Sequence, residues 1–500
     1  MKKAFSLLLL SFVLLVAVLS LSSCGVLLKK TGFYDGYEYH VDSEYEITLT
    51  GYKGDKTKLE IPSWLDGYKV VGIAFDENDK TLEKIESIKI PKTILSISSD
   101  TFLPCKNLKQ IKVALDNPKY KYFHDSLYTK DGKTLICYPQ GKEDAELILH
   151  KRVTKIADRA FLNARHLKKV TFSGTEKIGQ SAFIGCVSLE TVDFGPKMKE
   201  IGVSAFEGCP LLNSVAIPDT VERIEASAFK NCNALTSFSI GNGIKHLGTE
   251  ALGNLDAITT QNEFSGAYYL GNAKNPYAML IRVQSKTETE YIVHPETKAI
   301  YESAFEGCEN LESIELPNSL SCIGKRAFYN CKKLVNPVIP EFVNKIEDYS
   351  FYGCISITEI ILPSSVSAVG DSAFEGCTAL SSITLSNRTK LIGSMAFAEC
   401  TSLTQIEIPE VLSYIGNSAF SGCTALGTVA IPKSVSYIGK KAFAGCTHLN
   451  TVIFADTENW TMCEKTIELQ TLSDPATAAF VLTLQLEAMI KLQSDDALEE

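Results

Sequence analysis

Cysteine is the residue of this sequence whose type and spacing most invite a chemical role. Thiolates could hold a metal, but structural zinc needs four ligands that converge from close pairs, and no C-x-x-C pair occurs. We therefore predict no metal site. Eleven cysteines each follow a phenylalanine by three positions: Cys105, Cys186, Cys209, Cys232, Cys308, Cys331, Cys354, Cys377, Cys400, Cys423 and Cys446.

These cysteines could also form disulfide bonds. In stacked repeats, equivalent cysteines lie within bonding distance, but their Cα–Cβ vectors run parallel, which opposes bonding. Ala164 and Leu255 take the same slot in two repeats, so the slot suits a modest apolar group, as buried free cysteine does. We expect reduced, buried thiols, with disulfides left open because secretion would permit oxidation.

Catalytic and nucleic-acid-binding patterns are missing from the sequence. It has no H-E-x-x-H, G-x-S-x-G, Walker or dinucleotide-binding motif, and its seven histidines are scattered. We therefore predict that it is not an enzyme and needs no cofactor. With 49 basic and 59 acidic residues, its net charge of -10 argues against a nucleic-acid partner. The 45% hydrophobic content excludes general disorder.

The N-terminus has the pattern of an export signal. Lys2 and Lys3 precede an apolar and serine-containing run over 5–21, which is followed by Ser22-Ser23-Cys24. This pattern predicts a secretory signal peptide over 1–23. The residues before Cys24 resemble a bacterial lipobox, which implies cleavage before Cys24 and its diacylation. The alternative is an ordinary signal peptide that is cut nearby.

A period of 23 residues organises most of the remaining chain. A phenylalanine slot, filled once by Leu252, recurs fourteen times between Phe75 and Phe443, and from Phe305 onward every step is 23 residues. Such a period predicts a repeat solenoid in which each coil stacks on its neighbours. Two gaps in the period place inserts near 116–147 and 263–290. We assign the solenoid to 59–454.

One repeat shows why each coil should form a short strand. In residues 420–442, Leu426, Val429 and Ile431 form L-x-x-V-x-I, in which the last pair alternates as a half-buried strand requires. Pro432 ends the strand because it lacks an N–H, and Gly439 permits a tight corner. The pattern is that of a leucine-rich repeat with one short β-strand per coil.

Two segments of the repeat array show a specific family resemblance. The segments IPKSVSYIGKKAFAGCTHLNTV and LPSSVSAVGDSAFEGCTALSSITL resemble BspA-like leucine-rich repeats of bacterial surface proteins, and the resemblance covers about 59–454. It implies secreted or surface-exposed proteins, several of them lipid-anchored, that adhere to host proteins or other bacteria. It carries no catalytic residues. The sequence departs from the pattern at Leu252, Ala164, Leu255 and the two inserts.

The segments outside the repeats are predicted to form caps. Residues 24–58 should hold the anchor, a linker and a β-rich N-terminal cap, because 37–59 alternates in polarity. Residues 455–500 should form a helical C-terminal cap and tail that begins near Pro475. We expect Phe480, Leu484 and Met489 of that cap to cover the last core layer.

Two surfaces are candidates for binding. Insert one should form a β-hairpin, whereas insert two gathers Tyr268, Tyr269 and Tyr277, which either brace the solenoid or anchor a ligand. The second candidate surface is the outward side of the strands, which includes Thr384 and Gln405. If a ligand binds, we expect replacement of Tyr268 and Tyr269 to weaken binding more than replacement of Thr384 and Gln405.

These features predict a lipid-anchored, surface-exposed protein of the cell envelope. Its role should be non-covalent binding to proteins of the host matrix or of other cell surfaces, with membrane attachment through the N-terminal lipid. The alternatives are a structural spacer or assembly component of the envelope, and a carbohydrate-binding module that uses the tyrosines of insert two.

Overall fold

The fold is a stack of short coils in two compact units. The computed structural model describes residues 31–98, 100–462, 465–466, 469–484 and 487–491. The described residues up to 131, together with 137–142, form the first unit, and those of 132–136 and from 143 onward form the second. The predicted signal peptide and Cys24 lie outside the described residues.

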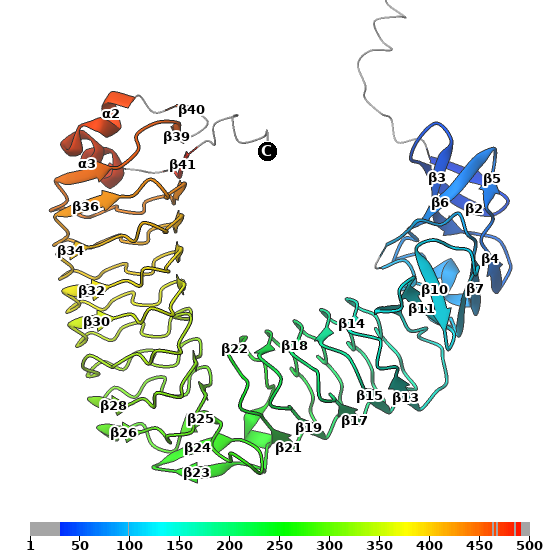
Figure 1. Cartoon of the computed structure of the whole chain (residues 1–500), viewed down its shortest axis with the longest axis horizontal. Helices are drawn as coiled ribbons and strands as arrows, with labels where there is room; N and C mark the ends of the chain where they lie inside the picture. Colours follow the sequence, from blue (N-terminus) through cyan, green and yellow to red (C-terminus); the bar gives the residue numbers. More distant parts are fainter. Residues whose placement is uncertain (1–30, 99, 463–464, 467–468, 485–486, 492–500) are drawn as a thin grey trace, which may run out of the picture. The chain divides into compact units, whose positions relative to one another are not determined.

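The first unit begins with antiparallel strands and continues as parallel coils (Figure 1). β2 pairs antiparallel with β1 and β3, which supplies the β-rich cap that the alternating sequence predicts. The parallel sheet β4-β7-β9 follows, and β10 and β11 form a hairpin within insert one. The elements are β1 (Thr31–Tyr34), β2 (Tyr37–Val41), β3 (Glu46–Tyr52), β4 (Lys58–Glu60), β5 (Trp64–Leu65), β6 (Tyr68–Ile73), the 3-10 helix η1 (Lys80–Lys84), β7 (Ser87–Ile90), β8 (Ser96–Ile97), β9 (Gln110–Val113), β10 (Tyr120–Phe123) and β11 (Ser126–Thr129).

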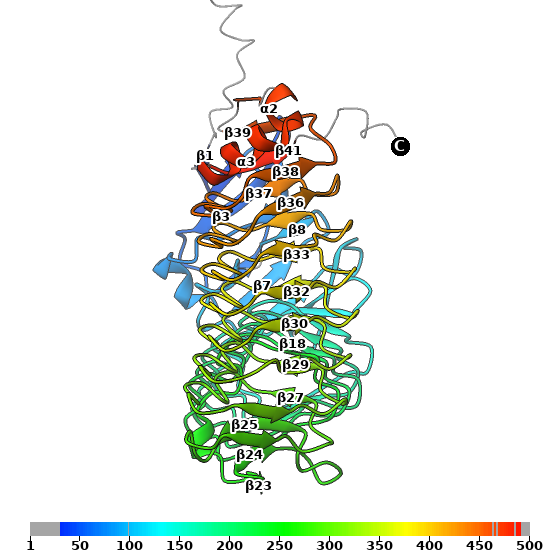
Figure 2. The same cartoon turned by 90° about the vertical axis from the view of Figure 1, so that its left-hand side faces the viewer.

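The second unit carries the predicted strand of the repeat on one side of its coils (Figures 1 and 2). Within each sheet on this side, neighbouring strands pair in parallel and in register, with each core residue beside its equivalent one repeat later. These strands are β13 (Glu146–Leu149), β15 (Lys169–Phe172), β17 (Thr191–Asp193), β19 (Ser214–Ala216), β21 (Ser237–Ser239), β26 (Glu290–Ile292), β28 (Ser313–Glu315), β30 (Glu359–Ile361), β32 (Ser382–Thr384), β34 (Gln405–Ile406), β36 (Thr428–Ile431) and β38 (Thr451–Phe454).

Most coils of this unit also contain a second, shorter strand, which the sequence pattern did not predict. It spans two residues, of which the second is an isoleucine, leucine or valine that packs in the core. These strands are β12 (Thr134–Cys137), β14 (Lys155–Ile156), β16 (Lys177–Ile178), β18 (Glu200–Ile201), β20 (Arg223–Ile224), β22 (His246–Leu247), β25 (Met279–Val283), β27 (Ala299–Ile300), β29 (Cys322–Ile323), β31 (Ala368–Val369), β33 (Leu391–Ile392), β35 (Tyr414–Ile415) and β37 (Tyr437–Ile438), the longer β12 and β25 standing in the same sheets.

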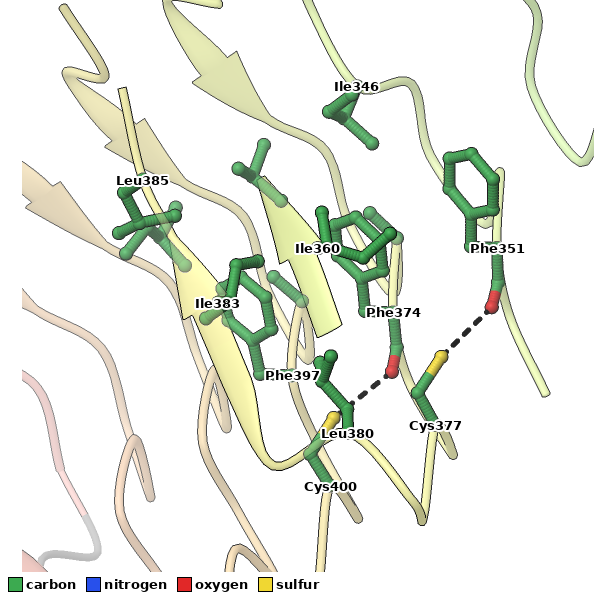
Figure 3. Close-up of a cluster of buried hydrophobic side chains, with 14 of the residues drawn as sticks. Ile346, Phe351, Ile360, Phe374, Cys377, Leu380, Ile383, Leu385, Phe397 and Cys400 are labelled. Atoms are coloured by element: carbon green, nitrogen blue, oxygen red, sulfur yellow. Dashed lines mark hydrogen bonds between the residues drawn. The ribbon is translucent and has the colours of Figure 1, made fainter. Parts of the chain in front are cut away.

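Phenylalanine forms the spine of the core. Phe351, Phe374 and Phe397 are fully buried, and their rings stack with centroids 5.4 and 5.6 Å apart and planes within 4° of parallel (Figure 3). Each ring therefore contacts its equivalent in both adjacent coils. Offset stacking of this kind adds to the free energy that burial of the rings already contributes.

The eleven cysteines that follow the repeat phenylalanines form what we call the cysteine ladder. They lie beside this spine as free, buried thiols. Cys377 Sγ donates to the Phe351 carbonyl oxygen at 3.2 Å, and Cys400 Sγ donates to that of Phe374 at 3.2 Å (Figure 3). The thiol thus satisfies a carbonyl of the preceding coil, a role that the apolar-slot interpretation missed. Burial raises the pKa of Cys377 to about 12, which keeps the thiol protonated and unreactive at neutral pH.

The C-terminal cap of the second unit differs in structure from the coils that it covers. α3 (Pro475–Leu484) packs on β38 beside α2 (Leu469–Ser473), and β41 (Met489–Lys491) pairs antiparallel with β37 and β39 (Trp460–Met462), which also pairs with β40 (Lys465–Thr466). Ala478, Ala479 and Leu482 face the core. The prediction for Phe480 and Leu484 is wrong, since both are exposed, whereas Met489 is buried as expected, though on a strand.

Candidate functional site

One candidate binding surface of the second unit is formed by its strands, and we call it the strand face. It consists of the side chains that point away from the core between β28 and β36. They are exposed or half-exposed and comprise Ser313, Glu315, Asn336, Val338, Glu359, Ile361, Ser382, Thr384, Gln405, Glu407 and Thr428. They point outward because side chains alternate along a strand, and the intervening residues fill the core.

Thr384 and Gln405 lie together on the strand face, as the repeat register predicts. They belong to β32 and β34 and line a shallow depression of about 170 Å³ with Ser382 and Glu407. The lining is mostly polar and the volume is small, so the depression offers hydrogen bonds but little room for a large side chain.

A larger groove lies next to this depression. It has a volume of about 370 Å³ and is lined by Asn336, Pro337, Val338, Ile339, Glu341, Glu359, Ile361 and Pro363. Val338 is 81% exposed and Ile361 is 62% exposed. The sequence analysis missed these two residues, although Pro337 was a signal: it stands 23 positions before Ile360, in a slot where proline cannot serve a strand ladder.

The tyrosines of insert two are mostly occupied by the fold. The insert is an antiparallel meander of β23 (Asn262–Phe264), β24 (Ala267–Leu270) and β25, preceded by the 3-10 helix η2 (Leu255–Ala257). Tyr269 is fully buried, and the Tyr277 ring packs edge-on against it with centroids 5.6 Å apart. The ring of Tyr268 is half-exposed and lies under the Arg282 guanidinium at 4.8 Å.

A charged cluster joins coils on either side of insert two. His246 Nε2 lies 3.3 Å from Glu225 Oε2, and His246 Nδ1 lies 3.4 Å from Glu347 Oε1. Hydrogen bonds to the two carboxylates raise the pKa of His246 from 6.5 to about 9. The contact with His246 lowers the pKa of Glu225 to about 2. The cluster is structural, because all three side chains are largely buried and each is paired.

This cluster predicts a stability contribution that depends on pH. Since the folded-state pKa of His246 exceeds the unfolded value, the contribution should be complete below about pH 6.5 and vanish as pH rises past about 9. We expect His246→Gln to lower the free energy of unfolding by about 2–3 kcal/mol at pH 6 and by much less at pH 10. Denaturant unfolding of both proteins at the two pH values measures this.

The matched control is His166→Gln, because His166 is exposed. Its difference from the parent protein should stay small and constant with pH. Equal destabilisation by His246→Gln at pH 6 and pH 10 would contradict a charged His246.

The described part of the chain shows neither a cluster of metal ligands nor a membrane-spanning helix. Its residues include no group of three histidine, cysteine, aspartate or glutamate side chains arranged to hold a metal ion. None of its helices is both long enough and apolar enough to cross a bilayer.

Comparison with known families decides what kind of repeat this is. The family model described as the BspA type leucine rich repeat region matches residues 79–129, 141–264, 284–380 and 344–462, well over half of the chain. The chain belongs to the BspA-type leucine-rich repeat family. A BspA-type solenoid, like other leucine-rich repeat solenoids, is typically a binding scaffold rather than an enzyme.

Solved structures with a similar fold come from bacterial leucine-rich repeat proteins. A leucine-rich repeat protein of Bacteroides ovatus ATCC 8483 is 22% identical over 85% of this BspA-type chain and 88% of its own, with a TM-score of 0.31. A leucine rich cell surface protein of Faecalibacterium prausnitzii A2-165 is 22% identical over 86% and 96%, with a TM-score of 0.30. The T. pallidum leucine rich repeat protein is 29% identical over 34% and 82%, with a TM-score of 0.33.

These likenesses add nothing to the family assignment, which rests on the family model alone. No curated protein is similar enough to count as a relative.

Proposed function

We propose that this BspA-type protein is a lipid-anchored adhesin of the cell surface that binds proteins through its strand face. The supporting observation is the combination, on one side of the coils, of the apolar groove at Val338 and Ile361 with the polar depression at Thr384 and Gln405. Apolar contacts surrounded by polar groups are the usual composition of a protein interface. The description of the similar F. prausnitzii protein as a cell surface protein is in line with this location.

The strand face is a better candidate than insert two. Tyr269 and Tyr277 already pack within the fold, so an exchange of Tyr269 would remove core contacts rather than ligand contacts. Tyr268 remains as a possible contributor, although Arg282 covers one side of its ring. Carbohydrate stacking on the insert tyrosines loses support for the same reason.

The test is capture of partners from host extracellular matrix and from envelope extract by residues 25–500, which is the mature chain without its lipidated cysteine. We expect the parent protein to retain specific proteins from the matrix, and the double variant Thr384→Ala/Gln405→Ala to retain at least several-fold less of them. Tyr268→Ser, which changes the accessible insert tyrosine without touching the core, should retain them at the parent level.

Two results would count against the proposal. Capture of envelope proteins alone would favour the spacer or assembly role. Loss of capture in Tyr268→Ser with full capture by the strand variant would place the binding site on insert two.

A further inference from the structure

The strand ladder of the second unit is broken between β28 and β30, as it also is between β21 and β26 and between β32 and β34. β28 pairs with β26 and β30 pairs with β32, but residues 336–338 between them form no strand, so β28 and β30 belong to separate sheets. Pro337 stands in the slot that Ile360 and Ile383 fill in the next two repeats, and it has no N–H for a ladder bond.

The side chain of Asn336 replaces part of the missing ladder. Asn336 has a φ of 35°, and its Oδ1 accepts hydrogen bonds from the backbone N–H groups of Thr358 at 2.9 Å and Glu359 at 3.1 Å. Among the described residues, no backbone hydrogen bond joins 334–340 to β30. The preceding coil therefore contacts β30 through the Asn336 side chain and not through a backbone ladder.

Apolar side chains are exposed at this interruption. In the coils on either side, Glu315 and Thr384 take the outward slot that Val338 and Ile361 fill here. The two side chains stand next to each other over a groove of about 370 Å³ whose floor includes Pro337, Ile339 and Pro363. A groove of this size can take one or two apolar side chains of a partner, which is how interface anchors are usually seated.

The charges around the groove are all negative. Glu341 and Glu359 line it, and no lysine, arginine or histidine of the described chain lies within ion-pair distance of either carboxylate. The strand face also carries Glu315 and Glu407 but no basic side chain. A partner with positive charge beside its apolar anchor would match this distribution, because complementary charge favours encounter and register.

We infer that the groove at Pro337 seats an extended protein segment in which an apolar side chain is flanked by lysine or arginine. The apolar side chain packs between Val338 and Ile361, and the flanking cations pair with Glu341 and Glu359. This inference rests on the proposed function and names the kind of partner that the strand face takes.

The test uses the mature chain and three synthetic peptides. The first places one leucine between two lysines, the second replaces the lysines with glutamates, and the third replaces the leucine with serine. We expect saturable binding of the first peptide that weakens with added salt, and binding at least about tenfold weaker for the other two.

Variants of the protein locate the site. Ile361→Ser and Glu359→Lys should each weaken binding of the first peptide by about tenfold or more. The matched control is Ile453→Ser, because Ile453 is also an outward isoleucine on this side of the coils and is 50% exposed. This control should bind as the parent protein does.

Each other outcome overturns the inference. Equal effects of Ile361→Ser and Ile453→Ser, or no saturable binding of the first peptide, would show that the groove is not the site. Self-association of the chain that Ile361→Ser abolishes would make a second copy the occupant. If matrix capture depends on Thr384 and Gln405 but not on Ile361, the groove inference fails while the proposed function stands, whereas absence of any capture removes the proposed function itself.

Discussion

Replacement of Phe397 by alanine should lower the free energy of unfolding by about 3–5 kcal/mol. Phe397 is fully buried, and its ring stacks between those of Phe374 and Phe420 with centroids 5.6 and 5.4 Å away. Its removal would leave a cavity between two coils and break both stacking contacts. Because coils contact only their neighbours, the loss should also separate the unfolding of the segments on either side.

Denaturant unfolding followed by fluorescence and by limited proteolysis measures both effects. Phe342→Ala is the matched control, since Phe342 belongs to the same array but is 66% exposed, and it should change stability by less than about 1 kcal/mol. A Phe397→Ala protein as stable as the control would show that the stacked rings do not hold the coils together.

Replacement of Cys24 by alanine should move the protein from the membrane fraction to the soluble fraction. If Cys24 is diacylated, its two acyl chains would supply the attachment, because stable anchoring takes two hydrophobic signals. The described residues contain no helix that could replace them. Labelling of cells with a radioactive fatty acid, followed by fractionation, measures the loss of both the lipid and the attachment.

The control for this experiment is Ser11→Ala, which alters the same apolar run but keeps Cys24. It should be labelled and retained like the parent protein. Labelled, membrane-bound Cys24→Ala protein would contradict the lipobox interpretation and favour an ordinary signal peptide with another means of attachment.

The sequence by itself determined the architecture, because a solenoid coil contacts only the coils before and after it. The 23-residue period places Phe374 beside Phe351 and Phe397. The core of every regular repeat can therefore be predicted from a single repeat. Gly439 was also recognised as a required glycine, although for another reason. A Cβ there would lie 2.4 Å from backbone atoms of Gly416 and Asn417 in the preceding coil, so it is coil stacking, more than a corner, that demands glycine.

Only the tertiary structure decided what happens where the period fails. The partners of His246 are Glu225 and Glu347, and the second of these lies beyond insert two at a distance no repeat spacing gives. The tyrosines of insert two look equivalent in the sequence, yet Tyr269 is buried and Tyr268 is half-exposed. The exposure of Val338 and Ile361 occurs at the coil where Pro337 prevents a strand from forming. In each case the outcome depends on contacts between segments that are out of register, and a repeat pattern carries no information about those.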